Sequence, residues 1–263
     1  MNMERALDFT VSPSSLLHKY HKTLLPLATL GDIDLLGDLM LTPKSIDFNG
    51  SLNTACGNLD IDCGMIKGPG SQMRIDGGVS SASFNPSTLL PQLAALTQVS
   101  FESEADVTLV PGGEINGTVS LAIPEVVWNG YDFTDLTARA DFFGSRFEAE
   151  LTSLSPLLDF SINGGADLKG EDAMSEFYAD IRHLSLSPFV KSGRFHDYSV
   201  SCGVDASVQG RNPDTMTGWV NVGNLAFSGA DGKNLTIPYI EFDALSILSL
   251  IHISEPTRLR RIS

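Results

Sequence analysis

Alternation of apolar and polar residues is the feature that most constrains the fold of this 263-residue chain. From Val99 to Leu109, every odd position is apolar or small and every even position is polar. Successive side chains of a β-strand point to opposite faces, so such a run is typical of a strand with one apolar and one polar face. The same pattern recurs in residues 33–41, 46–52, 115–123, 136–142, 147–151 and 200–208.

Turn-forming segments separate these runs and predict antiparallel neighbours. Proline, glycine and Asn-Gly pairs favour turns or bulges, and they occur at residues 67–70, 77–78, 111–113, 129–130, 163–165 and 231–232. Polar, proline-containing starts followed by leucines predict short helices near residues 14–25 and 87–96, with a weaker copy at 186–190. The expected fold is therefore all-β: an elongated, curved antiparallel sheet with a few short helices.

The pairing of a short helix with a run of strands predicts irregular internal repeats. We expect one segment, residues 1–247, with repeats at about 10–84, 85–184 and 185–247. Residues 248–263 resemble the translation of a transposase sequencing adapter. They carry three of the 17 basic residues but one of the 32 acidic residues. We expect this tail to be an artefact that contributes nothing to function.

Charge and cysteine content exclude several classes of function. A net charge of -15 argues against a nucleic-acid partner and against electrostatic docking onto anionic lipid headgroups, but not against contact with the apolar part of lipids. Cys56 and Cys63 are close enough for a hairpin disulfide, although small buried residues in strands are the preferred interpretation. No run of about 18 apolar residues predicts a membrane helix. The start lacks a signal-peptide core, and we expect the native N-terminus to lie upstream.

The sequence shows no catalytic motif. His18 and His21 have a spacing that can bind zinc, but no further ligand accompanies them and lysines flank them. The aspartates at 32–38 and 60–62 alternate as expected for a solvated strand face. No nucleophile elbow, phosphate-binding loop or dinucleotide fingerprint is present. We therefore expect no catalytic residue, no cofactor and no metal, and predict that the chain is not an enzyme.

Segments in the middle of the chain resemble the AsmA-like and TamB-like proteins of Gram-negative bacteria, in the style found in the Bacteroidetes. The segment 115–119 is similar to their strand–glycine–strand signature. The segment 128–136 is similar to their recurrent turn, and 140–142 with 157–164 to the strands that follow it. The Pro-Ser-x-Leu-Leu segment after Phe84 fits as well.

The resemblance implies a repeating, U-shaped β-groove with an apolar inner face. It further implies a periplasmic protein that an N-terminal helix, absent from this chain, anchors in the inner membrane. Such proteins are thought to carry phospholipid towards the outer membrane or to assist outer-membrane protein assembly. The implied partners are phospholipid acyl chains and, through regions not in this chain, the outer-membrane assembly machinery.

Physical chemistry supports a groove that binds acyl chains. An apolar sheet face must be covered, and the predicted helices are too short to cover it. Each buried methylene contributes about 0.8 kcal/mol, so ten contribute roughly 8 kcal/mol before opposing terms. The alternatives are a structural or adhesive β-solenoid or β-sandwich with a closed core and, less favoured, an enzyme on a β-helix. The predicted groove-facing residues are Val99, Phe101, Val107, Leu109, Val119, Leu121 and Ile123.

Overall fold

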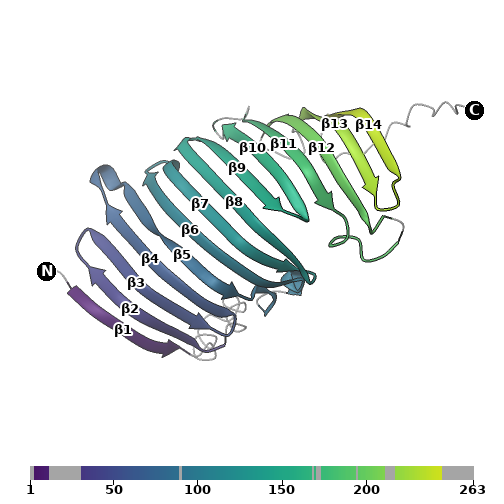
Figure 1. Ribbon diagram of the computed structural model, residues 1–263. Coiled ribbons are helices and arrows are strands. Elements are labelled where there is room, and N and C mark those ends of the chain that lie inside the picture. The colour runs from purple at the N-terminus through teal and green to yellow at the C-terminus, as the bar shows by residue number, and fades with distance from the viewer. Residues whose placement is uncertain are drawn as a thin grey trace, which may run out of the picture.

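The computed structural model describes residues 3–11, 31–88, 91–167, 169, 173–193, 195–210 and 217–244. These residues form one antiparallel sheet of fourteen strands, in which the order in space equals the order in sequence (Figure 1). The predicted helix at 14–25, the two histidines within it and the tail at 248–263 lie outside the described residues.

Each strand pairs with its predecessor and its successor along the chain. The strands are β1 (Met3–Val11), β2 (Ile33–Leu41), β3 (Ser45–Thr54), β4 (Gly57–Lys67), β5 (Met73–Phe84), β6 (Leu96–Val110), β7 (Glu114–Trp128), β8 (Tyr131–Gly144), β9 (Arg146–Ser155), β10 (Leu158–Asp167), β11 (Met174–Ser185), β12 (Tyr198–Gln209), β13 (Thr217–Gly229) and β14 (Asn234–Ala244). The only helical elements in the described part are the 3-10 turns η2 (Pro69–Ser71), η3 (Pro86–Thr88) and η4 (Pro91–Leu93).

The prediction of an all-β, curved antiparallel sheet is confirmed. All seven alternating runs lie inside strands, namely β2, β3, β6, β7, β8, β9 and β12. Short turns favour the neighbour order at hairpins such as β3–β4 and β7–β8, because a tight turn returns the chain beside the strand it has just left. Longer connections join β1 to β2, β5 to β6 and β11 to β12. The β7–β8 turn has Asn129 at φ 52° and Gly130 at φ 81°, the left-handed pair typical of a two-residue hairpin.

Three local predictions need correction. The weaker helix copy expected at 186–190 is a turn, in which the N–H groups of Phe189 and Val190 donate to Leu186 O. Residues 77–78 and 163–165, interpreted as turns or bulges, lie within β5 and β10, because glycine also suits close approach between strands. The helix predicted at 87–96 is reduced to η3 and η4, and β6 already begins at Leu96. Pro91 has no N–H to donate and disfavours a helical conformation at the residue before it, which explains why no longer helix forms.

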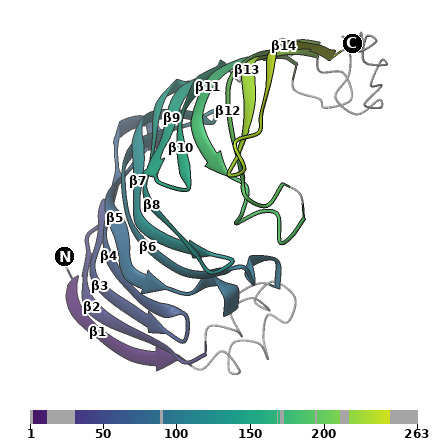
Figure 2. The ribbon, with the colours of Figure 1, turned by 45° about the vertical axis from the view of Figure 1, so that its right-hand side comes forward.

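The sheet curves along its length, and its apolar face is the concave one. In Figure 2 the loop between β11 and β12 lies inside the curve. Phe189 of this loop packs against Phe133 of β8, with ring centroids 6.2 Å apart. Phe133 lies opposite Val126, which lies opposite Val99, so all three share one face. We call this concave face, defined by Val99 and its cross-strand neighbours, the inner face.

Few side chains of the described residues are fully buried, as expected for a single layer of strands. The buried apolar residues do not form a central core but are spread along the sheet and its connections: Cys56, Phe133, Phe160, Ala166, Ala173, Ala179 and Ala206. Ladder hydrogen bonds and cross-strand side-chain pairs therefore supply most of the stabilisation of this sheet.

Candidate functional site

An uninterrupted row of uncharged residues crosses the inner face from β2 to β14. Residues directly opposite one another in the ladders share a face, so the register identifies the row without ambiguity. It contains one residue from each strand, in order Leu39, Phe48, Cys63, Gly77, Ala105, Val119, Ala140, Ala149, Gly164, Phe177, Ala206, Val220 and Phe242.

A second row runs beside the first and is also free of charge. Its members are Gly37, Gly50, Ile61, Val79, Ser103, Leu121, Ala138, Leu151, Ile162, Ala179, Val204, Val222 and Ile240. Together the two rows make an apolar strip along the inner face from β2 to β14, and on β1 the residue opposite Leu39 is Arg5.

The register places the seven predicted groove-facing residues on the inner face. Val99, Phe101, Val107 and Leu109 lie on β6, and Val119, Leu121 and Ile123 lie on β7. They are not direct partners of one another in the β6–β7 ladder, where Val107 faces Gly117 and Leu121 faces Ser103. Whether they bind lipid remains a prediction.

The inner face is hollowed between β7 and β11. A cavity of about 560 Å³ lies there, and of the seven predicted residues only Val119 and Leu121 line it. Its remaining apolar and small lining residues on the next four strands are Ala138, Ala140, Phe147, Ala149, Leu151, Ile162, Gly164, Gly165, Ala166, Ser175 and Phe177. Ser120, Arg139, Glu150 and Glu176 line it as well.

Small residues create this cavity. Ala140, Ala149 and Gly164 are consecutive members of the first row. Three adjacent strands, β8, β9 and β10, therefore have only a methyl group or a hydrogen atom at this position of the inner face. Phe147 and Phe177 contribute bulkier side chains to its lining. Sequence reasoning recognised the strands at 136–142 and 147–151 but not the cavity, because the alignment of small residues depends on register.

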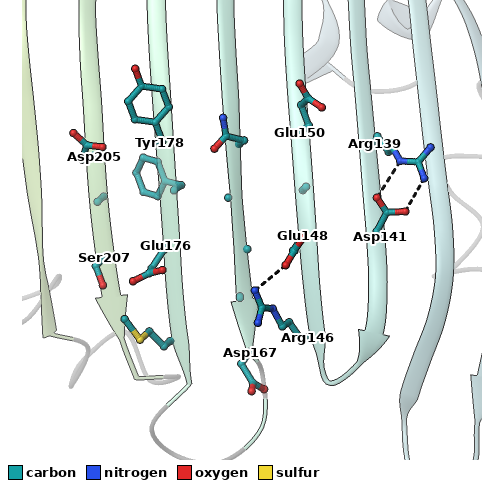
Figure 3. Close-up of a pocket in the computed structure, with 18 of the residues that line it drawn as sticks. Arg139, Asp141, Arg146, Glu148, Glu150, Asp167, Glu176, Tyr178, Asp205 and Ser207 are labelled. Atoms are coloured by element: carbon teal, nitrogen blue, oxygen red, sulfur yellow. Dashed lines mark hydrogen bonds and ion pairs between the residues drawn. The ribbon is translucent and has the colours of Figure 1, made fainter.

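The face opposite the inner face is polar and strongly acidic. We call it the outer face and define it by the row that contains Asp62, Glu104, Arg139, Glu150 and Asp205. A hollow of about 780 Å³ lies on this face. Figure 3 shows carboxylates from β8 to β12 in its lining, together with Arg139 and Arg146. A further hollow of about 1010 Å³ lies over β2 to β8.

Ion pairs on the outer face offset part of its negative charge. The Arg139 guanidinium donates to both oxygens of Asp141, at 3.0 and 2.9 Å, and the Thr118 hydroxyl donates to Asp141 Oδ1 at 2.6 Å. The hydrogen bonds from Arg139, and then that from Thr118, lower the pKa of Asp141. The neighbouring Asp76 and Asp106 lie directly opposite one another, which is unfavourable for two carboxylates.

We expect the replacement Asp141→Asn to lower the Tm at neutral pH. A carboxylate whose pKa is lowered in the folded state contributes stability above its unfolded pKa, about 3.9, and this stability is lost as the pH falls through the folded pKa. The Tm difference from the wild type should therefore shrink below about pH 4. The control is Asp62→Asn, on the same face and without an ion pair to a described residue. An identical pH dependence in both variants would contradict the assignment.

The described residues contain no other chemical centre. No group of three or more histidine, cysteine or acidic side chains within them is arranged to hold a metal ion. No disulfide joins Cys56 and Cys63, so the hairpin disulfide does not form. The expectation of buried cysteines in strands is also wrong, because Cys56 is buried but lies in the β3–β4 turn, whereas Cys63 is exposed and Cys202 half-buried. In the part of the chain that the structure covers, no helix has the length and apolar character needed to cross a bilayer.

Comparison of the chain with protein-family models, with curated proteins and with solved structures finds no match.

Proposed function

We propose that the inner face binds the acyl chains of phospholipids and that the chain is a segment of a lipid-transfer groove without catalytic activity. The observation that carries this proposal is the pair of uncharged rows that continues from β2 to β14 on the concave face. A surface of this extent has no second layer of sheet over it in the described structure. An acyl chain is the ligand whose chemistry matches it.

The solvent exposure of the cavity residues supports this proposal. Val119, Leu151 and Phe177 are 36%, 37% and 42% exposed although they lie on the apolar face. Contiguous apolar patches of this kind mark binding surfaces in soluble proteins. Covering them with methylene groups removes apolar area from water on both partners, at about 25 cal/mol for each Å².

The composition of the two rows favours movement of the lipid along the groove. Neither row contains a charged side chain that would hold a headgroup at one level. Apolar contacts are non-directional, so a chain displaced by one strand exchanges one set of contacts for an equivalent set. Lipid would thus travel across the strands while its headgroup stays in water.

The resemblance to AsmA-like and TamB-like proteins supplies the wider setting of the proposal. In that setting the groove lies in the periplasm and carries phospholipid between the inner and the outer membrane. Anchorage in the inner membrane and contact with the outer-membrane assembly machinery would come from other regions of the full-length protein.

Filling the cavity tests the site. We expect Ala149→Trp to reduce the amount of lipid that co-purifies with the protein, because the indole would occupy the space beside Ala140 and Gly164. Lipid is measured by native mass spectrometry and by solvent extraction. The matched control is Ala122→Trp, an equal change on the outer face, where Ala122 lies opposite Glu102 and Thr137.

Equal lipid content in the two tryptophan variants would contradict the assignment of the cavity. Absence of lipid from the wild type, with a sheet that is stable on its own, would favour the structural or adhesive alternative.

A further inference from the structure

The loop between β11 and β12, residues 186–197, is longer than a simple turn and is held in place by hydrogen bonds. The structure describes it apart from residue 194. Its ends are joined by a hydrogen bond from Leu186 N to Tyr198 O at 2.9 Å, and Val190 N donates to Leu186 O at 2.8 Å. Asn129 Nδ2, from the distant β7–β8 turn, donates to Pro188 O at 3.1 Å. The loop is thus held on the inner side of the sheet (Figure 2).

This loop exposes aromatic side chains. Phe189 is 50% exposed although one side of its ring packs on Phe133. Phe195 is 52% exposed and contacts Tyr198 edge to face, with centroids 5.5 Å apart. Large apolar side chains held half out of a protein by their contacts are suited to insertion into the interfacial region of a bilayer.

The charge of the loop differs from that of the rest of the chain. In sequence it has Lys191 and Arg194 against one carboxylate, Asp197, whereas the whole chain has a net charge of -15. Lys191 is exposed and forms no ion pair with a described residue. The overall charge predicts repulsion from anionic headgroups. Many of the acidic side chains lie on the outer face, whereas Asp197 belongs to the loop itself and Asp231 follows Ala230, whose N–H donates to Asp197 O at 3.3 Å.

We propose that the β11–β12 loop docks onto a bilayer that contains anionic lipid, with Phe189 and Phe195 inserted between headgroups and Lys191 against their phosphates. Phe133, which supports Phe189, belongs to the inner face. Docking here therefore sets the bilayer beside the apolar strip. The inference extends the proposed lipid function, but the two can fail separately.

Vesicle sedimentation tests the docking. The full chain is mixed with vesicles of phosphatidylcholine alone or of phosphatidylcholine and phosphatidylglycerol in equal parts. We expect stronger binding to the mixed vesicles, weakened about fivefold by Lys191→Ala and about tenfold by Phe195→Ser. The controls are Lys44→Ala, in the exposed β2–β3 turn, and Leu154→Ser, which removes a side chain that is 68% exposed in β9. Circular dichroism checks the folding of each variant.

Two outcomes would overturn the docking: no vesicle binding by the wild type, or equal losses in loop and control variants. Self-association that depends on Phe195 without vesicle binding would identify a second copy of the chain as the occupant instead. Lipid extracted from the same preparations separates the two proposals. If the protein carries lipid but does not bind vesicles, the docking proposal alone is wrong. If the protein binds vesicles but carries no lipid, the groove proposal alone is wrong.

Discussion

Replacing Leu121 by Asp is expected to abolish co-purification of lipid while leaving the sheet folded. Leu121 lines the cavity and belongs to the second uncharged row. An unpaired carboxylate in an apolar environment costs several kcal/mol. Acyl chains would therefore not occupy the part of the groove beside the substituted position, or water would enter the groove there. Because the unliganded face is open, the carboxylate can hydrate and the strand pairing survives.

Ser120→Asp is the matched control, since Ser120 is adjacent in β7 and faces Glu104 and Arg139 on the outer face. It introduces the same charge with Ser120 on the outer-face row, although Ser120 is also among the residues that line the cavity, and it should retain lipid. Val107→Asp, with Thr108→Asp as its control, repeats the comparison on β6. If Leu121→Asp and Val107→Asp both unfold the protein, the inner face is a dry, closed core and the groove account is wrong.

A second large effect is expected at Gly117 of β7, where the replacement Gly117→Ala should strongly destabilise the sheet. Gly117 has φ 133°, and a Cβ there would lie 2.0 Å from Asp106 O and 2.8 Å from Val107 Cα. The backbone conformation costs about 1–3 kcal/mol for a residue other than glycine. Displacing the neighbouring backbone adds a further cost of about 1–3 kcal/mol.

Gly113→Ala carries only the first of these costs, so the difference between the two variants isolates the second. Gly113 lies in the β6–β7 turn at φ 89°, but nothing approaches within 4 Å of its ideal Cβ position. Urea unfolding should therefore show a distinctly larger loss of stability for Gly117→Ala than for Gly113→Ala. Equal losses would show that the close approach of β6 and β7 at Gly117 is unimportant.

Seven of the fourteen strands and the antiparallel pairing of neighbours were predictable from the sequence, because both depend on local signals. Alternation marks those seven strands, as at residues 99–109, and turns such as Asn129-Gly130 join neighbours. The prediction of turns or bulges at residues 77–78 and 163–165 was wrong, because a glycine pair suits both a turn and a close contact within a sheet. Gly77, at φ 131°, would place a Cβ 2.0 Å from Asp62 O across the ladder with β4.

The cavity was less predictable than the apolar face. The seven predicted residues were chosen from the two strands with the strongest alternation, and they lie on the inner face. The hollow is centred further along, where Ala140, Ala149 and Gly164 align across three strands. Alanine and glycine weaken the apolar signal, and their alignment requires the register of each hairpin, which alternation alone does not supply.

The most direct test of the central claim is the lipid content of the wild-type chain. The protein is purified without detergent, and its bound molecules are identified by native mass spectrometry and solvent extraction. The groove account predicts phospholipid that is released on unfolding, retained by Ser120→Asp and missing from Leu121→Asp. Wild-type protein that is folded and free of lipid, and that takes up none when mixed with phospholipid vesicles, would contradict it.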